Sequence, residues 1–163
     1  MRSIRVAVAG LGVVGRETVR LLRANRERFA NRLGALIELV AVCDRDCRRE
    51  ALALSLPSSV ARYTDPRALA SADFDIVVEL IGGLDAPKRL ALESLGAGRH
   101  VITANKRLIA HCWRELQRAS AKGGGRLSFE GSVAGGIPVL QALDNSFAAN
   151  RIESVYGILN GTT

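Results

Sequence analysis

The fold is decided by the stretch Ile4-Arg-Val-Ala-Val-Ala-Gly-Leu-Gly-Val-Val-Gly15, close to the start of the chain. Its first half is a short run of β-branched and small residues with no charge after Arg5, which is typical of a strand buried on both faces. The second half has the pattern G-x-G-x-x-G, and apolar residues follow it at helical spacing. A strand, a glycine turn and a helix in this order indicate a dinucleotide-binding unit. We therefore predict an α/β fold of the Rossmann type, doubly wound, with a mainly parallel sheet and helices on both faces.

Each glycine of this turn has an expected physical role. Gly10 permits the tight turn, Gly12 lets the backbone approach a pyrophosphate, and Gly15 lets the helix pack closely on the strand. The N-terminus of the helix supplies N–H groups and the positive end of a dipole for the phosphates. We predict that NAD or NADP binds here, although a glycine-rich turn without a ligand is the alternative. The predicted cofactor-binding residues of the turn are Gly10, Leu11, Gly12, Val13, Val14 and Gly15.

Composition describes an ordinary globular protein. The 163 residues are 48% apolar and 24% charged, which is enough for one domain with a core, or for one domain and the start of another. No apolar run approaches the ~20 residues that a membrane-spanning helix needs. The N-terminus leads straight into the first strand, without a signal peptide. We therefore expect a cytoplasmic location and no membrane partner.

The net charge of +7 does not predict nucleic-acid binding. Only three of the 23 basic residues are lysines, and the arginines are spread along the whole sequence, with those of the first helix expected on a solvated face. Aromatic residues are 4%, too few for stacking on bases. The three cysteines have neither a disulfide nor a zinc spacing and are interpreted as buried thiols.

The second predicted strand, Ile37–Cys43, ends at two residues that bear on the choice of cofactor. A carboxylate in this place binds the ribose hydroxyls and favours NAD, whereas a neighbouring arginine can hold the 2′-phosphate of NADP. Asp44 and Arg45 are adjacent, so the sequence offers both and the choice stays open. A cap of the next helix is the alternative role for Asp44.

Two further strands are expected to end at the same crevice. The strand Asp75–Ile81 closes with Gly82-Gly83, so that Ile81 and Gly82 face the crevice, although a plain turn also explains these glycines. The strand His100–Thr103 brings Lys106 to the carboxyl edge, where ligands bind in open α/β sheets. We predict that Lys106 is a donor beside the nicotinamide and the substrate. A surface lysine at a helix start is the alternative.

Other predicted elements complete the chain. Asn25–Ala35 is either an extension of the first helix or a long loop, and Pro57 stops a helix over 46–56. Pro87 opens a helix that runs to about Gly96. A short strand, Arg126–Glu130, precedes a glycine loop. The final expected elements are a helix from Pro138 to about Ala148 and a strand over 151–159, after which no closing signal is present.

The whole pattern resembles the homoserine dehydrogenase family over essentially all 163 residues. The glycine turn is shared by many dehydrogenases, but the later motifs are more particular. The resemblance rests on Gly10–Gly15, Val77–Gly83, Gly98–Lys106, Glu130–Pro138 and Tyr156–Thr163.

The resemblance implies reduction of L-aspartate 4-semialdehyde to L-homoserine with NADPH or NADH, in threonine and methionine biosynthesis. Lys106 would be the catalytic lysine beside the nicotinamide and substrate, and Thr103 and Ala104 would line the cofactor. A sodium ion is also implied, since a hard cation prefers carboxylate and carbonyl oxygens. Its ligands would be the Glu130 side chain and the backbone carbonyls of Val133, Gly135 and Ile137.

The family also has a substrate and dimerisation domain, which carries further catalytic residues. We therefore expect residues 1–135 to be the NAD(P)-binding domain and 136–163 the truncated start of the second, in a fragment that binds dinucleotide without turnover. The full-length enzyme would be a homo-oligomer. Two alternatives are a different dehydrogenase, such as aspartate dehydrogenase, and a non-catalytic module that senses dinucleotide.

Overall fold

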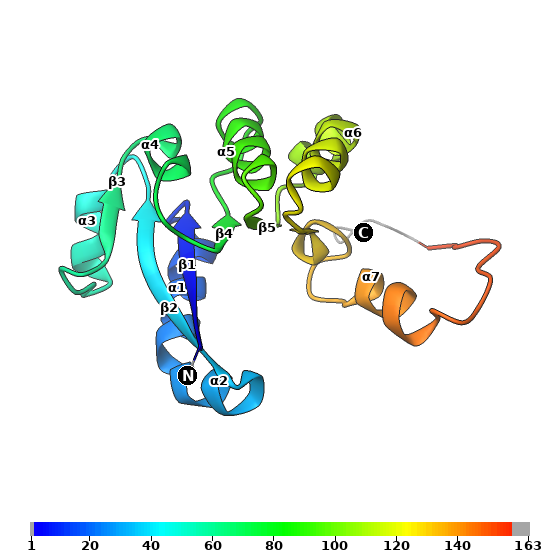
Figure 1. Cartoon of the computed structure of the whole chain (residues 1–163), viewed down its shortest axis with the longest axis horizontal. Coiled ribbons are helices and arrows are strands. Elements are labelled where there is room, and N and C mark those ends of the chain that lie inside the picture. The colour runs from blue at the N-terminus through cyan, green and yellow to red at the C-terminus, as the bar shows by residue number, and fades with distance from the viewer. Residues whose placement is uncertain (1, 158–163) are drawn as a thin grey trace.

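A computed structural model describes residues 2–157 and shows one parallel sheet with helices packed on it (Figure 1). The strand order β3-β2-β1-β4-β5-β6 confirms the predicted Rossmann-type fold. The strands within these residues are β1 (Arg2–Ala9), β2 (Ala35–Cys43), β3 (Ala61–Tyr63), β4 (Ile76–Glu79), β5 (His100–Thr103) and β6 (Leu127–Ser128).

The helices alternate with the strands, as parallel connections require. They are α1 (Val13–Ala24), α2 (Arg26–Leu33), α3 (Cys47–Ala53), α4 (Pro66–Ala70), α5 (Asp85–Gly96), α6 (Lys106–Gly123) and α7 (Val139–Gln141), with a 3₁₀ turn, η1 (Glu130–Ser132), and a π-helical turn, η2 (Ala142–Ser146). Within the described part of the chain, no helix is both long enough and apolar enough to cross a membrane.

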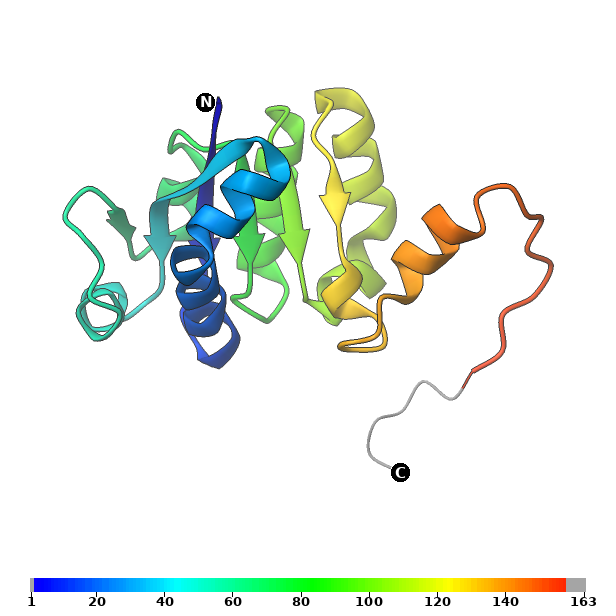
Figure 2. The same cartoon turned by 90° about the horizontal axis from the view of Figure 1, so that it is seen from below.

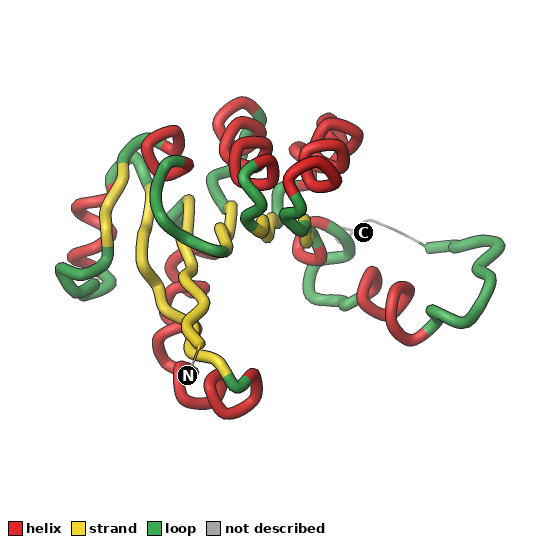
Figure 3. Tube along the Cα trace, in the orientation of Figure 1, coloured by secondary structure: helices red, strands yellow, loops and turns green. Residues whose placement is uncertain are grey.

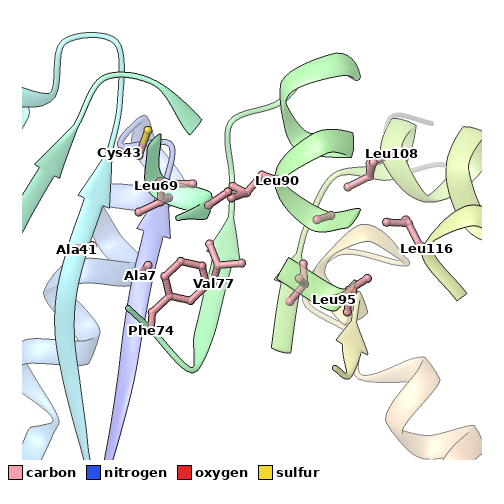
Figure 4. Close-up of a cluster of buried hydrophobic side chains, with 14 of the residues drawn as sticks. Ala7, Ala41, Cys43, Leu69, Phe74, Val77, Leu90, Leu95, Leu108 and Leu116 are labelled. Carbon is pink, nitrogen blue, oxygen red and sulfur yellow. The ribbon is translucent and has the colours of Figure 1, made fainter. Parts of the chain in front are cut away.

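The larger core lies between the sheet and the helices α4, α5 and α6. Ala7 and Val77 of the central strands belong to this core together with leucines of the three helices, all of them fully buried (Figure 4). The leucines are Leu69, Leu90, Leu95, Leu108 and Leu116. Because β1 is paired on both sides and covered on both faces, its run of small and β-branched residues is explained by burial.

The other face of the sheet is covered only in part by the described residues. Val19 of α1 and Ala51 of α3 pack there on Val8 and Val42. Figure 2 shows α1 and α2 in front of β1 and β2, whereas β5 and β6 carry no helix on this side. Ile102 of β5 is accordingly 41% exposed.

Several element boundaries differ from the sequence prediction, three of them for clear local reasons. The polar segment after α1 is helical over Arg26–Leu33, in line with the first alternative, but α2 is separated from α1 by a break at Asn25, and Ala35 already belongs to β2. The helix α3 ends at Ala53 rather than near residue 56, since Ser55 adopts a left-handed conformation (φ 49°) and the chain turns Leu54 and Leu56 into the core. Helix α5 begins two residues before Pro87.

The prediction for the C-terminal segment was right for the helix and wrong for the strand. The expected helix from Pro138 forms as α7 and continues as η2 to Ser146, whereas the strand predicted over 151–159 is absent from its described residues, 151–157 (Figure 3). All seven of these residues are exposed, so the alternation of their side chains has no face to bury and no neighbouring strand to pair with in the described structure. The rest of the predicted strand, and most of the motif Tyr156–Thr163, lies outside the described residues.

Arg5 joins the two central strands at their amino ends. Its backbone N–H donates to Oδ2 of Asp75 at 2.8 Å, and its Nη2 donates to Oδ1 of Asp75 at 2.8 Å. Arg5 also forms an ion pair with Asp73. The hydrogen bonds from Arg5 lower the pKa of the Asp75 carboxyl.

We expect Asp75→Asn to remove part of the pH dependence of stability on the acid side. A lowered carboxyl pKa stabilises the fold above the unfolded-state value near 4, and this stabilisation is lost as pH falls through the folded-state value. The effect is less than about 1 kcal/mol, because the Asp75 side chain is 39% exposed and solvent screens the pair. Urea unfolding at pH 7 and pH 3 checks it. If Asp75→Asn changed the free energy of unfolding by the same amount at pH 7 and at pH 3, the lowered pKa of Asp75 would be contradicted.

Candidate functional site

A crevice of about 680 Å³ opens at the carboxyl edge of the sheet, where the ends of β1, β2 and β4 meet. The chain order reverses between β1 and β4, and ligands of open α/β sheets bind at such a switch point. The volume lies within the range of small-molecule sites. Position and size therefore both indicate a ligand-binding crevice.

The glycine turn forms the floor of the crevice, and its glycines differ in their surroundings. A Cβ on Gly15 would lie 1.8 Å from the carbonyl oxygen of Gly10, so the start of α1 packs directly on the turn. Gly10 itself has a φ of +94°, and a Cβ there would lie 2.4 Å from the carbonyl oxygen of Leu80. Nothing lies within 4 Å of a Cβ on Gly12. Two glycines are thus required by packing, whereas Gly12 faces open space.

Gly12 is also the N-cap residue of α1, and no side chain caps this helix end. The first N–H groups of a helix have no partner within the helix and are suited to phosphate. A diphosphate could therefore approach the backbone at Gly12, where a larger residue would occupy the space. This geometry fits a dinucleotide.

The Asp44 carboxylate binds backbone groups with both of its oxygens. Oδ2 accepts the N–H of Leu11 at 2.7 Å, and Oδ1 accepts the N–H of Asp46 at 3.1 Å. The first bond ties the end of β2 to the glycine turn. The cap position of α3 is held by Asp46 rather than by Asp44. Arg45, next to this carboxylate, is exposed and lines the crevice.

Sequence reasoning missed two charged residues of the crevice, Arg16 and Glu50. Arg16 was expected on a solvated face, but its Nε lies 3.3 Å from Oε2 of Glu50, and both side chains line the crevice. The pairing depends on how α1 and α3 meet, which the sequence did not show. A signal for Arg16 was available, because it follows the last glycine of the turn at the start of a helix that begins in the crevice.

A wholly buried carboxylate, Glu79, lies behind the opposite wall and was also missed. Its Oε1 accepts the N–H of Ile81 at 2.8 Å, and its Oε2 accepts the hydroxyl of Thr103 at 2.5 Å. Thr103 is only 1% exposed, so its side chain belongs to this buried pair rather than to the crevice surface. A glutamate within an otherwise apolar strand was the available signal.

The structure thus divides the predicted site residues into two groups. Around the crevice it places Gly10, Leu11, Gly12, Asp44, Arg45, Ile81 and Gly82. Outside its lining it leaves Val13, Val14, Gly15, Thr103, Ala104 and Lys106. The second group contains the first residues of α1, among which Gly15 is buried by packing, and the residues at and after the end of β5, one strand further along the sheet. Lys106 is the first residue of α6 and is exposed, directly after Asn105, which caps that helix.

The predicted sodium ligands lie in a separate turn after β6. Glu130 accepts the N–H of Leu140 through Oε1 and the N–H of Gln141 through Oε2, each at 3.0 Å. The intervening turn, which contains Val133, Gly135 and Ile137, has left-handed backbone at Ala134 and Gly136. No group of three or more His, Cys, Asp or Glu side chains suited to a metal occurs among residues 2–157.

The three cysteines are buried, as the sequence analysis predicted. Burial raises the pKa of the Cys43 thiol to about 12 and also raises the pKa of Cys47. Since the thiolate is the reactive form, burial disfavours reaction at both thiols. Cys43 also lines the crevice.

Comparison with known proteins agrees with the geometry. A family profile described as "Homoserine dehydrogenase, NAD binding domain" matches residues 10–130. The homoserine dehydrogenase of Neisseria gonorrhoeae is 40% identical over 164 residues, covering 100% of this chain but 37% of that protein. The chain therefore spans little more than a third of the length of this relative.

Solved structures give the same result. The homoserine dehydrogenase from Thiobacillus denitrificans has a TM-score of 0.83 and 40% identity, over 94% of this chain and 35% of that one. A hyperthermophilic archaeal homoserine dehydrogenase, solved in complex with NADPH, has a TM-score of 0.70 over 86% of this chain and 48% of that one; at 20% identity this shows likeness of fold alone. From its sequence, its fold and the profile that covers most of it, the chain belongs to the homoserine dehydrogenase family, whose NAD-binding domain it matches.

Proposed function

We propose that this chain is the NAD(P)-binding part of an oxidoreductase that reduces L-aspartate 4-semialdehyde to L-homoserine. The main support for the proposal is the open space at Gly12, which lines a crevice at the switch point of the sheet. Family membership supplies the substrate. The proposal places the pyrophosphate at Gly12, Val13 and Val14, the adenosine end beside Asp44 and Arg45, and the nicotinamide end toward Ile81, Gly82, Thr103 and Ala104.

The bound cofactor would supply the hydride, and the chain would supply position and electrostatic field. Lys106 begins α6 beyond the Ile81–Gly82 wall and carries an exposed ammonium group. This group would stabilise the negative charge that develops on the substrate oxygen. Aspartate dehydrogenase activity and a non-catalytic sensing role are the alternatives, and the comparisons favour neither of them.

We also propose that the crevice prefers NADP(H) to NAD(H). The Asp44 carboxylate braces the glycine turn by accepting backbone N–H groups, and the preference rests on the arginine next to it. The exposed guanidinium of Arg45 lies beside it at the place where a 2′-phosphate is expected. Three arginines and one aspartate line an adjoining hollow, so its net charge is positive; they are Arg45, Arg48, Arg49 and Asp46.

A fluorescence titration with NADPH tests the binding site. We expect saturable binding by the wild-type chain and at least tenfold weaker binding by Gly12→Ala, because the added methyl group fills the space for the pyrophosphate. Gly12→Ala should unfold within about 0.5 kcal/mol of wild type, since nothing surrounds its new Cβ. The matched variant Gly15→Ala should instead lose about 1–3 kcal/mol of stability through overpacking.

The same titration tests the cofactor preference. Arg45→Ala should weaken NADPH about tenfold and leave NADH within about twofold, because the ion pair with the 2′-phosphate is lost. Arg32→Ala, an equal change of charge on α2, is the control. Equal binding of NADH and NADPH by the wild type would overturn the preference and leave the binding site intact, whereas no binding of either would overturn both.

Activity is tested on the protein that the whole gene encodes. We expect NADPH-dependent reduction of aspartate 4-semialdehyde, and a loss of about a hundredfold in kcat in Lys106→Ala with the Kd for NADPH unchanged. The readout is the absorbance of NADPH. Weak reduction accompanied by strong oxidation of aspartate would instead support an aspartate dehydrogenase.

We propose sodium as the ion of the Glu130 turn. Its donor set is one carboxylate with backbone carbonyls, which suits a hard cation, and each Glu130 oxygen keeps a lone pair after accepting one N–H. Replacing choline chloride with sodium chloride at constant ionic strength should raise the Tm of the wild-type chain by roughly 2–4 °C. Glu130→Gln should abolish this difference. Equal Tm values of the wild type in both salts would contradict a sodium site.

The remaining proposals concern organisation. We propose a boundary between residues 1–135 and 136–163, which is supported by the end of the family match at residue 130. We also propose a homo-oligomer and a cytoplasmic location for the full-length enzyme, as the resemblance to the family implies.

A further inference from the structure

The buried carboxylate of Glu79 has an unusual environment. Glu79 is 0% exposed at the carboxyl end of β4, where it pairs in register with Thr103 of β5. Its oxygens accept one backbone N–H and one hydroxyl, and no arginine or lysine of the described chain forms an ion pair with it. Burying a carboxylate without a cation costs free energy of folding. Proteins that carry apolar residues in such places are often equally stable or more stable. Stability alone therefore does not explain Glu79.

The partners of Glu79 belong to a longer network that connects two loops. The Thr103 hydroxyl oxygen accepts the N–H of Asn105 at 3.0 Å. The Asn105 side chain then donates through Nδ2 to the carbonyl of Gly83 at 3.0 Å and accepts the N–H of Leu108 through Oδ1 at 3.0 Å. The loop after β4 is thus bound at both of its ends, by Glu79 at Ile81 and by Asn105 at Gly83.

This loop forms a wall of the crevice and has little rigidity of its own. Leu80, Ile81, Gly82 and Gly83 all line the crevice, and the two glycines have φ values of +76° and +75°. Glycine has the greatest backbone freedom, so a wall built on two left-handed glycines needs external fixation. The same network also fixes the first turn of α6, where Lys106 lies.

We propose that Glu79 is a positioning residue. Through Thr103 and Asn105 it fixes the position of the Leu80–Gly83 wall of the crevice relative to Lys106. The inference rests on the proposed function in one respect, namely that this wall contacts a dinucleotide. The brace itself is a property of the free chain and can be measured without a ligand.

Three variants of the 163-residue chain test the brace. Thr103→Val removes the hydroxyl and keeps the shape, Thr103→Ser restores the hydroxyl, and Ser94→Ala removes a buried hydroxyl without a hydrogen-bond partner in the described structure. Amide hydrogen exchange is followed by NMR at Ile81 and Leu108, and at Val8 and Val77 of the core. The Kd for NADPH is measured on the same samples.

In Thr103→Val we expect exchange at Ile81 and Leu108 to accelerate about tenfold more than at Val8 and Val77, the effect of losing one hydrogen bond to a charged group. The Kd for NADPH should rise about tenfold. Thr103→Ser should restore both values, and Ser94→Ala should change neither.

Uniform acceleration of all four amides in Thr103→Val would show a merely structural role and overturn the proposal. Selective acceleration without a change in the Kd for NADPH would overturn the positioning of the crevice wall. If the wild-type chain binds no NADPH, the proposed function fails, whereas the brace is still decided by the exchange pattern.

Discussion

The structure depends on the close contact between Gly15 and Gly10, where the start of α1 packs on the turn after β1. A side chain on Gly15 would begin 1.8 Å from the Gly10 carbonyl oxygen, which no adjustment of a side chain could relieve. This contact sets the direction in which α1 leaves the sheet. It also leaves the N-terminus of α1 at the crevice beyond the carboxyl ends of β1 and β4, so that the packing of the fold and the location of the crevice have the same cause.

Two carboxylates hold the walls that rise from this contact. Asp44 binds the glycine turn from the end of β2, and Glu79 binds the loop after β4. In each case the carboxylate accepts a backbone N–H of the wall. This hydrogen bond does not depend on which side chains the wall residues carry. These two carboxylates thereby act on the shape of the site, and the other charged residues that line it are Arg45 and the Arg16–Glu50 pair.

In the described residues, helices cover only one face of the sheet along its whole width. The helices α4, α5 and α6 bury the sheet on one side, whereas Ile102 remains 41% exposed on the other. Beyond β6 the turn at Glu130 and the helix α7 lie outside the sheet, and the Glu130 carboxylate organises that segment by accepting two N–H groups of α7. Lys106 lies between the crevice and this segment along the order of the sheet, next to β5.

The βα unit, the parallel sheet and the strand ends that meet at the crevice were predictable from the sequence, because buried runs, glycine turns and helix spacing are local properties. Three contacts of the site were visible only in the folded chain: Asp44 with Leu11, Arg16 with Glu50, and Glu79 with Thr103. Those pairs join residues 33, 34 and 24 positions apart, so they depend on strand order and helix packing. The strand predicted over 151–159 is absent from its described residues, 151–157, for the same reason, since alternation forms a strand only where a neighbouring strand and a face to bury exist.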